Sequence, residues 1–418
     1  MAEPSAIARA CFDAGLAAAD PERAVAQALA EDPGIVRARG FLTYVAIGKA
    51  AVPMMRAAMA AKKPDKAFLV TNYENAATLE GCECHSAGHP TPDENGARAA
   101  KLLIRKLSTA WSGDRIVVLL SGGGSALLPA PVPGVPLEDK IALNDLLVHS
   151  GLAIGEINTV RRRLSLLKGG GLTWLADPAK VTALILSDVP GDDLSAIASG
   201  PMVQPGDAPD AAERLLRAHR LWDRAPESVR RALSGPPPDR RTDSAARNRI
   251  IGSNAVSLRA MAGAVPEGFA ANLREAPLVG DVEAAAQEIA AAMRKAVGQG
   301  PAVLLFGGET TVRVRGEGLG GRNQELCLHV ARALDREGPS SDWAFLSGGT
   351  DGRDGPTDAA GGLVTPDTLA RIASSGLDLD VELAENNSNA LLRAADALLV
   401  TGATGTNVAD LQVAVLAG

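Results

Sequence analysis

Residues 307–325, GGETTVRVRGEGLGGRNQE, join two regular patterns of different period. The apolar run 301–306 before them is typical of a buried strand, and 311–315 alternates as a half-exposed strand does. Beyond the glycines, apolar residues recur at the spacing of one helix face in Leu326, Val330 and Leu334. The stretch therefore predicts a strand that enters a helix through a glycine-rich turn.

A glycine-rich turn at the start of a helix is suited to binding an anion. Backbone N–H groups lack partners there, and the helix dipole adds partial positive charge. Arg322 stands at the predicted helix start, with a planar guanidinium that matches phosphate or carboxylate. Glu309, just past the buried strand, has three roles open to it: orienting a cation, binding a ribose or holding Mg²⁺.

The same alternation of strand and helix runs through the rest of the chain. Apolar runs that predict strands lie at 41–47, 67–70, 116–120, 181–186, 249–251, 302–306, 343–346, 397–400 and 411–416. Helical spacing lies at 5–30, 50–61, 93–107, 137–150, 155–168, 281–296 and 322–335. This order predicts an α/β protein with a Rossmann-like, mostly parallel sheet flanked by helices. In such sheets ligands bind beyond the carboxyl ends of the strands.

The length of the chain, 418 residues, predicts two domains, since single hydrophobic cores rarely grow past about 250–300 residues. The proline-rich stretch 235–241 interrupts the alternation and marks the expected boundary, although a surface loop has the same composition. The predicted division is an N-terminal Rossmann-like domain over 1–240 and a C-terminal α/β domain over 241–418.

Composition disfavours several classes of partner. The net charge is −7, from 42 basic and 49 acidic residues, which disfavours a nucleic-acid-binding protein. No run of 18 apolar residues and no signal-peptide core occurs, so no membrane association is expected. Four cysteines are too few for a disulfide scaffold and predict a reducing, cytoplasmic location. Small molecules remain the expected partners, with the chain a monomer or a homodimer.

Several predicted strands end in glycine-rich or polar motifs. Gly48 and Lys49 follow the strand 41–47, and Asn254 follows 249–251 as a nucleotide-binding candidate. The best candidate for a phosphate cradle follows 116–120, because its glycines let the backbone approach an anion and its hydroxyls can donate. A tight turn is the alternative reading. The cradle residues are Ser121, Gly122, Gly123, Gly124 and Ser125.

Two aspartates are the best candidates for metal ligands. Asp188 and Asp351 each lie just after a predicted buried strand. Mg²⁺ in phosphate-binding sites takes one or two carboxylates together with phosphate oxygens and water. Capping of the following turn is the alternative role for an aspartate in such a place.

A polar stripe is predicted on the helix 155–168. Arg161, Ser165 and Lys168 fall with Asn158 on one face of this helix. A stripe with two cations is suited to clamp a small carboxylate. A solvated surface face is the alternative.

Taken together, these motifs resemble those of the class II glycerate 2-kinases, the MOFRL family. The similarity covers nearly the whole chain, in order, through residues 48–50, 88–90, 121–126, 168–170, 187–192, 307–325, 348–361 and 404–407. The resemblance implies a C-terminal domain of the MOFRL type and an active site in the cleft between the domains. It implies phosphorylation of D-glycerate at the 2-hydroxyl, with ATP and Mg²⁺. It also implies catalytic roles for Lys49 and Arg322, which would stabilise charge on the transferred phosphoryl group.

Two other functions stay open at this point. Related sequences carry the name hydroxypyruvate reductase, and 316–321 contains a literal Gly-x-Gly-x-x-Gly, the pattern of a dinucleotide site. Against this reading, the preceding strand alternates with arginines, and no acidic residue ends the next strand about 20 residues on. The second alternative is a sugar-acid or nucleotide-binding protein without turnover.

Overall fold

The computed structural model describes residues 3–204, 206–238, 245–337 and 342–418. The chain forms two compact units, Pro21–Ile251 and Met1–Asp20 with Gly252–Gly418. The predicted boundary at 240/241 lies outside the described residues. The division also differs at the N-terminus, because Met1–Asp20 belongs with the C-terminal unit and not with the domain predicted over 1–240. No helix in the described ranges is both long enough and apolar enough to cross a membrane.

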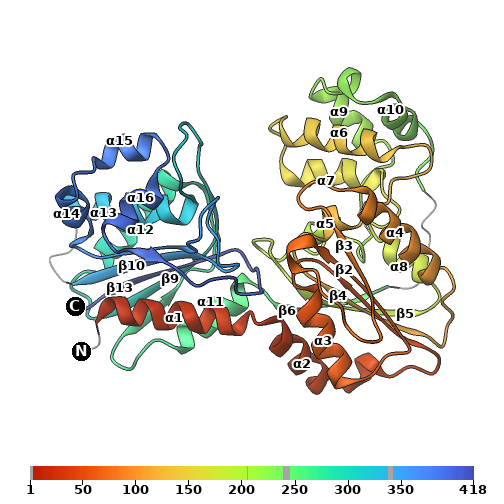
Figure 1. Cartoon of the computed structure of the whole chain (residues 1–418), viewed down its shortest axis with the longest axis horizontal. Helices are drawn as coiled ribbons and strands as arrows, with labels where there is room; N and C mark the ends of the chain where they lie inside the picture. The colour runs from red at the N-terminus through yellow and green to blue at the C-terminus, as the bar shows by residue number, and fades with distance from the viewer. Residues whose placement is uncertain (1–2, 205, 239–244, 338–341) are drawn as a thin grey trace. The chain divides into compact units, whose positions relative to one another are not determined.

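The unit Pro21–Ile251 is built on a six-stranded sheet with the order β3-β2-β1-β4-β5-β6 (Figure 1). From β3 to β5 all neighbouring strands pair in parallel, which confirms the predicted parallel sheet. The strand order reverses between β1 and β4, and such a switch point is where α/β sheets bind ligands. The strands are β1 (Leu42–Ile47), β2 (Lys66–Asn72), β3 (Glu83–Ala87), β4 (Arg115–Leu120), β5 (Lys180–Leu186) and β6 (Arg247–Gly252).

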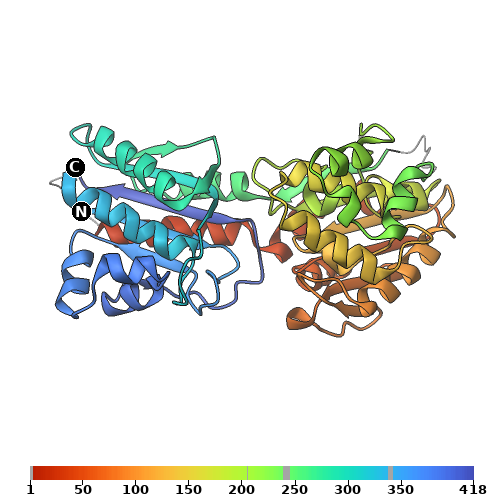
Figure 2. The same cartoon turned by 90° about the horizontal axis from the view of Figure 1, so that it is seen from above.

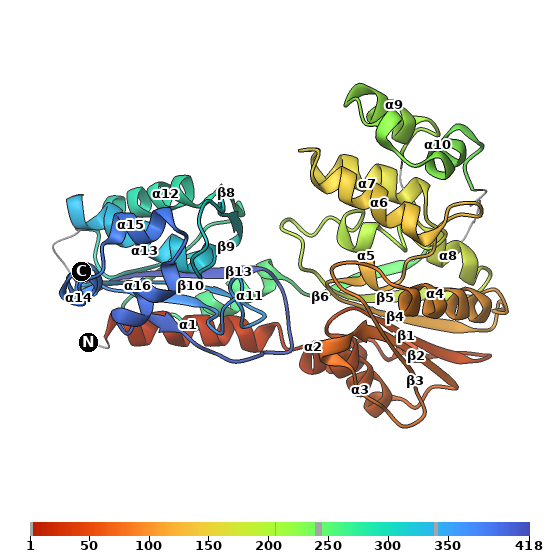
Figure 3. The ribbon, with the colours of Figure 1, turned by 45° about the horizontal axis from the view of Figure 1, so that its top comes forward.

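Helices cover both faces of this sheet, and a further group of helices has its own core. Figure 3 shows α2 and α3 on one face and α4 and α8 on the other. The separate group, α6, α7, α9 and α10, packs through Leu143, Val160, Leu216 and Val229. The helices are α2 (Pro21–Glu31), α3 (Ala51–Ala61), α4 (Glu94–Leu107), α5 (Gly124–Leu127), α6 (Leu137–Val148), α7 (Ile154–Arg163), α8 (Gly171–Ala176), α9 (Ala211–Ala218) and α10 (Glu227–Ser234).

The other unit has a mixed sheet with the order β12-β11-β10-β13-β9-β7, and β8 also pairs with β9. The central strands β10, β13 and β9 are antiparallel, whereas β7 and β8 run parallel to β9. The strands are β7 (Ala270–Leu273), β8 (Leu278–Asp281), β9 (Ala302–Thr311), β10 (Trp343–Gly349), β11 (Gly361–Val364), β12 (Leu398–Leu399) and β13 (Asp410–Leu416). The helices are α1 (Pro4–Ala18), α11 (Asn254–Gly263), α12 (Val282–Ala296), α13 (Arg322–Glu337), α14 (Thr368–Ser374), α15 (Leu379–Ala384) and α16 (Ser388–Ala394).

The N-terminal helical stretch predicted over 5–30 forms two helices that belong to different units. Pro21 begins α2, after Ala19 and Asp20 have ended the first helix. In α1, Ile7 and Phe12 are buried in a cluster with β10, β13 and α11. Figure 2 shows α1, in red, lying along this sheet beside β13. Burial of its apolar face therefore places α1 with the C-terminal unit.

The half-exposed strand predicted over 311–315 is wrong. β9 continues through Gly307 and Gly308 to Thr311, and 312–315 lies outside any strand. Gly308 has a φ of 145° and pairs with β13 on one side and β8 on the other. A Cβ at Gly308 would overlap the backbone of Leu278, so the two glycines continue the strand instead of turning it. The alternating residues belong to a loop, in which the N–H of Arg315 donates to Asn386 Oδ1 over 2.6 Å.

Candidate functional site

The carboxyl ends of β1 and β4 are joined by hydrogen bonds between the residues that follow them. Lys49 N donates to Gly122 O over 2.9 Å, and Ala50 N donates to Ser121 Oγ over 3.0 Å. Gly48 has a φ of 127°, and a Cβ there would overlap Ser121, so this close approach requires glycine. The two predicted motifs therefore meet at the switch point, one on each side.

Three more side chains border the glycine loop at this edge of the sheet. A Cβ on Gly123 would lie 3.3 Å from Lys49 Cγ and 3.2 Å from His89 Nε2, and a Cβ on Gly122 would overlap the carboxylate of Asp188. Burial raises the pKa of Asp188, and the charge of Lys49 partly opposes this. Burial and the charge of Lys49 lower the pKa of His89, which favours its neutral form. A cation, a carboxylate and a neutral imidazole thus lie around one loop.

A pocket of about 190 Å³ opens beside this loop, within the unit Pro21–Ile251. His89, Gly123 and Ser125 form part of its wall, and three cationic side chains form another part. None of the described residues that line the pocket is acidic. Uncompensated positive charge in a partly desolvated pocket attracts small anions. The cations are Lys140, Arg161 and Lys168.

Arg161 and Lys168, both predicted from sequence, are held by neutral groups. Arg161 Nε and Nη2 donate to Asn144 Oδ1 over 2.9 and 2.6 Å. Lys168 Nζ donates to the carbonyl oxygen of Ser125 over 3.0 Å and contacts the hydroxyls of Ser125 and Ser199. Burial lowers the pKa of both cations, and the charges of Lys140 and Arg161 lower that of Lys168 further. An anion in the pocket would oppose these shifts.

Lys140 is the third cation, and sequence reasoning did not single it out. It lies on α6 in line with Leu143 and Leu147, the positions i, i+3 and i+7 of a buried stripe. Its exposed fraction is 9%, and burial, with the charge of Arg161, lowers its pKa to about 8. The only sequence signal was a lysine in an apolar stripe of 137–148, and a lysine on a helix is usually at the surface.

Ser165 lies outside the pocket wall, because the predicted helix 155–168 is wrong beyond Arg163, where α7 ends. Ser165 forms a bridge with Pro131, and its hydroxyl accepts the N–H groups of Leu167 and Lys168, each over 3.3 Å. Such side-chain bonds compete with helix formation. Ser165 is fully buried, so its contacts fix the turn that carries Lys168.

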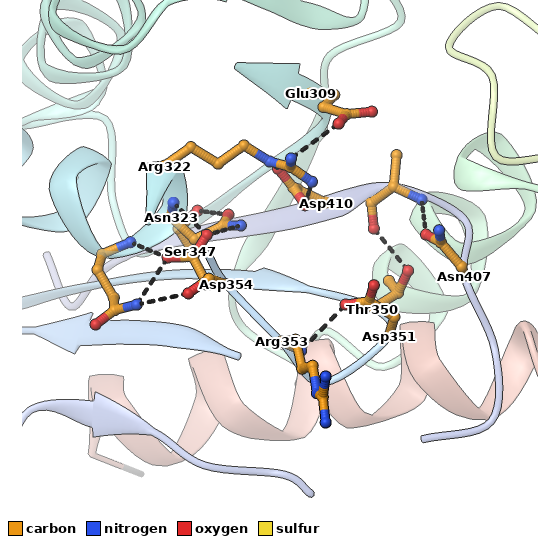
Figure 4. A network of polar contacts seen from close by, with 12 residues as sticks. Glu309, Arg322, Asn323, Ser347, Thr350, Asp351, Arg353, Asp354, Asn407 and Asp410 are labelled. Carbon is orange, nitrogen blue, oxygen red and sulfur yellow. Dashed lines mark hydrogen bonds and ion pairs between the residues drawn. The ribbon is translucent and has the colours of Figure 1, made fainter. Parts of the chain in front are cut away.

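In the other unit, Arg322 begins α13 and contacts two carboxylates (Figure 4). Its Nε and Nη2 donate to Asp410 Oδ2 and Oδ1 over 2.6 and 2.9 Å, and Nη1 lies 2.8 Å from Glu309 Oε1. The side chain of Asp410 is 0% exposed and that of Arg322 is 33% exposed. Burial lowers the pKa of Arg322, but the hydrogen bonds and charge of Asp410 raise it above its ordinary value. Of the three roles open to Glu309, the contacts fit orientation of a cation.

The anion at the start of α13 is the chain's own Asp354 (Figure 4). Its Oδ1 accepts the N–H of Asn323 over 3.1 Å, and its Oδ2 accepts the N–H of Gln324 over 2.9 Å. Burial raises the pKa of Asp354, while these hydrogen bonds oppose the rise. The expectation that a ligand anion binds this helix start is therefore wrong, because Asp354 already occupies the N–H groups.

Asn254 and Asp351 make contacts within this unit. Asn254 Nδ2 donates to the carbonyls of Val408 and Asp410 over 3.0 and 2.8 Å, at the start of β13. Asp351 Oδ1 accepts the N–H of Arg353 over 3.1 Å, which is a turn-capping contact. In the part of the chain that the structure describes, no three His, Cys, Asp or Glu side chains are grouped to hold a metal ion. A nucleotide contact for Asn254 and metal contacts for the two aspartates stay predictions.

The glycines of 316–321 pack against the chain itself. A Cβ on Gly316, Gly318 or Gly320 would overlap residues 385–388. The N–H of Gly318 donates to the carbonyl of Glu385 over 2.8 Å. The long loop 312–321 separates β9 from α13, whereas a dinucleotide site has a tight turn between strand and helix. Internal packing therefore accounts for the Gly-x-Gly-x-x-Gly pattern.

Two family models match the chain. Residues 7–234 match a domain of unknown function, DUF4147, and residues 302–410 match the MOFRL family. The first span contains the glycine loop and the cationic pocket, and the second contains Arg322. Both matches agree with the resemblance seen in the sequence motifs.

Proteins of similar length resemble the chain over both units. A glycerate 2-kinase of Pyrococcus horikoshii is 38% identical, over 96% of this chain and 94% of its own. A putative hydroxypyruvate reductase of Agrobacterium vitis is 40% identical, over 99% of this chain and 94% of its own. The crystal structure of a glycerate kinase from Thermotoga maritima matches with a TM-score of 0.90 at 38% identity, over 99% of each chain.

Proposed function

The chain belongs to the glycerate kinase family, and from this we propose that it is an ATP-dependent glycerate 2-kinase. It transfers the γ-phosphoryl group of ATP to the 2-hydroxyl of D-glycerate and yields 2-phospho-D-glycerate and ADP. One observation carries this proposal: a cationic pocket without acidic residues opens beside the glycine loop and Lys49. The pocket offers a site for the carboxylate of the acceptor, and the neighbouring glycine loop offers a site for the phosphates of the donor, both at the switch point of one sheet.

The pocket is assigned to the carboxylate of D-glycerate. Asn144 occupies Nε and Nη2 of Arg161, which leaves Nη1 for a ligand. Lys168 supplies a second cation, and Ser165 positions it through the turn. Gly123 and His89 line the same pocket and border the acceptor hydroxyls in this assignment.

The glycine loop is assigned to the phosphates of ATP. Gly122, Gly123 and Gly124 let the backbone approach phosphate oxygens. Ser121 and Ser125 act through the loops that they fix, since Ser121 binds Ala50 N and Ser125 contacts Lys168. Lys49 stabilises negative charge on the phosphoryl group in the transition state.

Asp188 fits one ligand of Mg²⁺. Its carboxylate lies beside Gly122 in the assigned phosphate site, where burial raises its pKa. Mg²⁺ takes one or two carboxylates plus phosphate oxygens and water, so a single aspartate suffices. When bound, the ion supplies charge neutralisation for the phosphates. Asp351 is the second proposed ligand, through the oxygen that does not cap the turn.

Arg322 is assigned the second cationic role in phosphoryl transfer. Its two hydrogen bonds with Asp410 fix the direction of the guanidinium. Glu309 orients Arg322 through their ion pair, and Glu309 and Asn254 are also proposed contacts of the nucleotide beside it. Lys49 and Arg322 belong to different units, and their action on one phosphoryl group in a cleft between domains stays a prediction. Positioning supplies most of the rate in phosphoryl transfer, so a strong general base is unnecessary.

The test is an incubation of the protein with D-glycerate, ATP and Mg²⁺ in the presence of enolase. Immediate formation of phosphoenolpyruvate is the expected result, because enolase acts on 2-phosphoglycerate. Product that appears only after phosphoglycerate mutase is added would assign the 3-hydroxyl instead. NADH consumption with hydroxypyruvate, without either product, would replace the kinase by a reductase. The cytoplasmic location and the choice between monomer and homodimer stay predictions.

A further inference from the structure

Lys140 lies on the apolar face of α6, where an apolar side chain would stabilise the folded protein more than a lysine does. Its neighbours on the same helix face, Leu143 and Leu147, are buried and line the same pocket. Lys140 itself is 9% exposed. Burial of a charged ammonium is unfavourable unless a partner of opposite charge or strong acceptors replace the lost water.

The Lys140 ammonium has no such partner within the described parts of the chain. No carboxylate forms an ion pair with it, and no side-chain or carbonyl oxygen accepts a hydrogen bond from it, in contrast to Arg161 and Lys168. Arg161, whose charge lowers the pKa of Lys140, is of the same sign. Lys140 lines the pocket, so its three donors can be satisfied there by water or by a ligand.

We propose that Lys140 is a specificity-determining residue of the acceptor site, which makes the pocket select acids over neutral polyols. This inference rests on the proposed function and adds a residue to it. Arg161 and Lys168 already have neutral partners, so the carboxylate of the acceptor gains most from the unpaired Lys140. A neutral acceptor such as glycerol leaves this ammonium desolvated and unpaired, which costs binding energy that an acid does not lose.

The melting temperature of a Lys140 variant distinguishes a binding role for this lysine from a structural role. A lysine kept for stability would lower the melting temperature when it is replaced. Removal of an unpaired buried charge should leave the melting temperature unchanged or raise it. Lys140→Met keeps the length and apolar stem of the side chain and deletes only the charge. Lys101→Met, at an exposed position of α4 in the same unit, is the matched control.

In Lys140→Met we expect the KM for D-glycerate to rise about 10- to 100-fold, because a hydrogen bond to a charged group is lost. The KM for ATP and the kcat at saturating D-glycerate should stay within about twofold, since Lys140 does not lie at the assigned phosphate site. The ratio of kcat/KM for D-glycerate over glycerol should fall by the same factor as the glycerate KM rises. Lys140→Arg should recover most of the affinity, and Lys101→Met should match the unaltered protein.

A folded Lys140→Met protein with an unchanged glycerate KM would overturn the inference. Equal losses for D-glycerate and glycerol would also overturn it, because they would show a general packing defect. If the Met variant does not fold, Lys140→Gln takes its place in the same assays.

Calorimetric binding of D-glycerate without ATP distinguishes this inference from the proposed function. Binding of D-glycerate that depends on Lys140, without turnover, would retain this inference and reject the kinase. Turnover with a glycerate KM that is unchanged in Lys140→Met would retain the kinase and reject this inference.

Discussion

The side chain of Lys49 borders the glycine loop, and its backbone N–H donates to the carbonyl oxygen of Gly122. Replacing Lys49 by alanine should lower kcat by about 10²–10³, the usual effect of deleting one group that stabilises transition-state charge. The melting temperature should change little. Steady-state kinetics and thermal unfolding of Lys49→Ala are the measurements, with the exposed Lys63→Ala as control. Turnover near that of the control would remove Lys49 from the catalytic role.

Arg322 differs from Lys49, because its charge is bound to a buried carboxylate. Arg322→Ala should lower kcat by about 10²–10³. It should also lower the free energy of unfolding by about 1–3 kcal/mol, since it strands Asp410, although the partial exposure of Arg322 screens the pair. The double variant Arg322→Ala/Asp410→Asn should recover stability in chemical denaturation but not turnover. Recovery of neither would mean that the pair has a different function.

The pocket predicts a pH dependence of acceptor binding. The pKa of Lys140 lies at about 8, below its ordinary 10.5. Lys140 is charged below pH 8 and loses its charge as the pH rises through 8, so the KM for D-glycerate should rise over that range. Arg161, Lys168 and His89 face the same pocket, and Lys140→Met isolates the contribution of Lys140. A profile that is identical in the variant would assign the titration to another group.

Stability should change in the opposite sense over the same pH range. The unfolded chain keeps Lys140 protonated up to about 10.5, whereas the folded protein releases this proton at about 8. Between these values the unfolded state binds more protons, so the contribution of Lys140 to the free energy of unfolding increases with pH. Denaturation series at pH 7 and 9, with and without Lys140→Met, measure this difference.

Sequence inspection found four of the cations, but it missed Lys140 and the groups that hold the others. Lys49, Arg161, Arg322 and Lys168 stand next to glycines or in polar stripes, which are local signals. Asp410 gave no such signal, since it only begins the final apolar run and meets Arg322 across 88 positions. Its role depends on contacts that the fold creates.

At the scale of elements, the start of α13 was predicted correctly, but its function differs from the predicted anion site. The arginine and the helix start lie where predicted, yet Asp354 takes the place of a ligand anion. The helix start is therefore a structural junction between α13 and the loop after β10. The glycine loop after β4 stays the proposed phosphate site.

Removal of this internal cap should destabilise α13. In Asp354→Ala the N–H groups of Asn323 and Gln324 lose their acceptor in a buried place, which should cost about 2 kcal/mol or more. Asp351→Ala, which removes a more exposed turn contact, should cost less than about 1 kcal/mol. Urea denaturation of both variants is the measurement. Equal effects would contradict the assignment of Asp354 as the helix cap.

At the scale of the whole molecule, the N-terminal helix connects the two ends of the sequence. α1 packs on β10 and β13, so the unit with the C-terminus needs the first residues of the chain. A chain that begins at Pro21 should lose hydrogen-exchange protection in β9, β10 and β13, while β1, β4 and β5 keep theirs. Protection retained in β13 would mean that this unit folds without α1.

Local periodicity and the polar motifs that follow the strands predicted the parallel sheet of the unit Pro21–Ile251 and the residues at its switch point. The reason is physical: each apolar run defines a strand, and parallel pairing brings all carboxyl ends to one edge. Only the tertiary structure decided that β13 pairs antiparallel between β9 and β10, that α1 joins that sheet, and that Lys140 turns into a pocket. These outcomes depend on pairing between distant segments, for which neighbouring residues carry no signal.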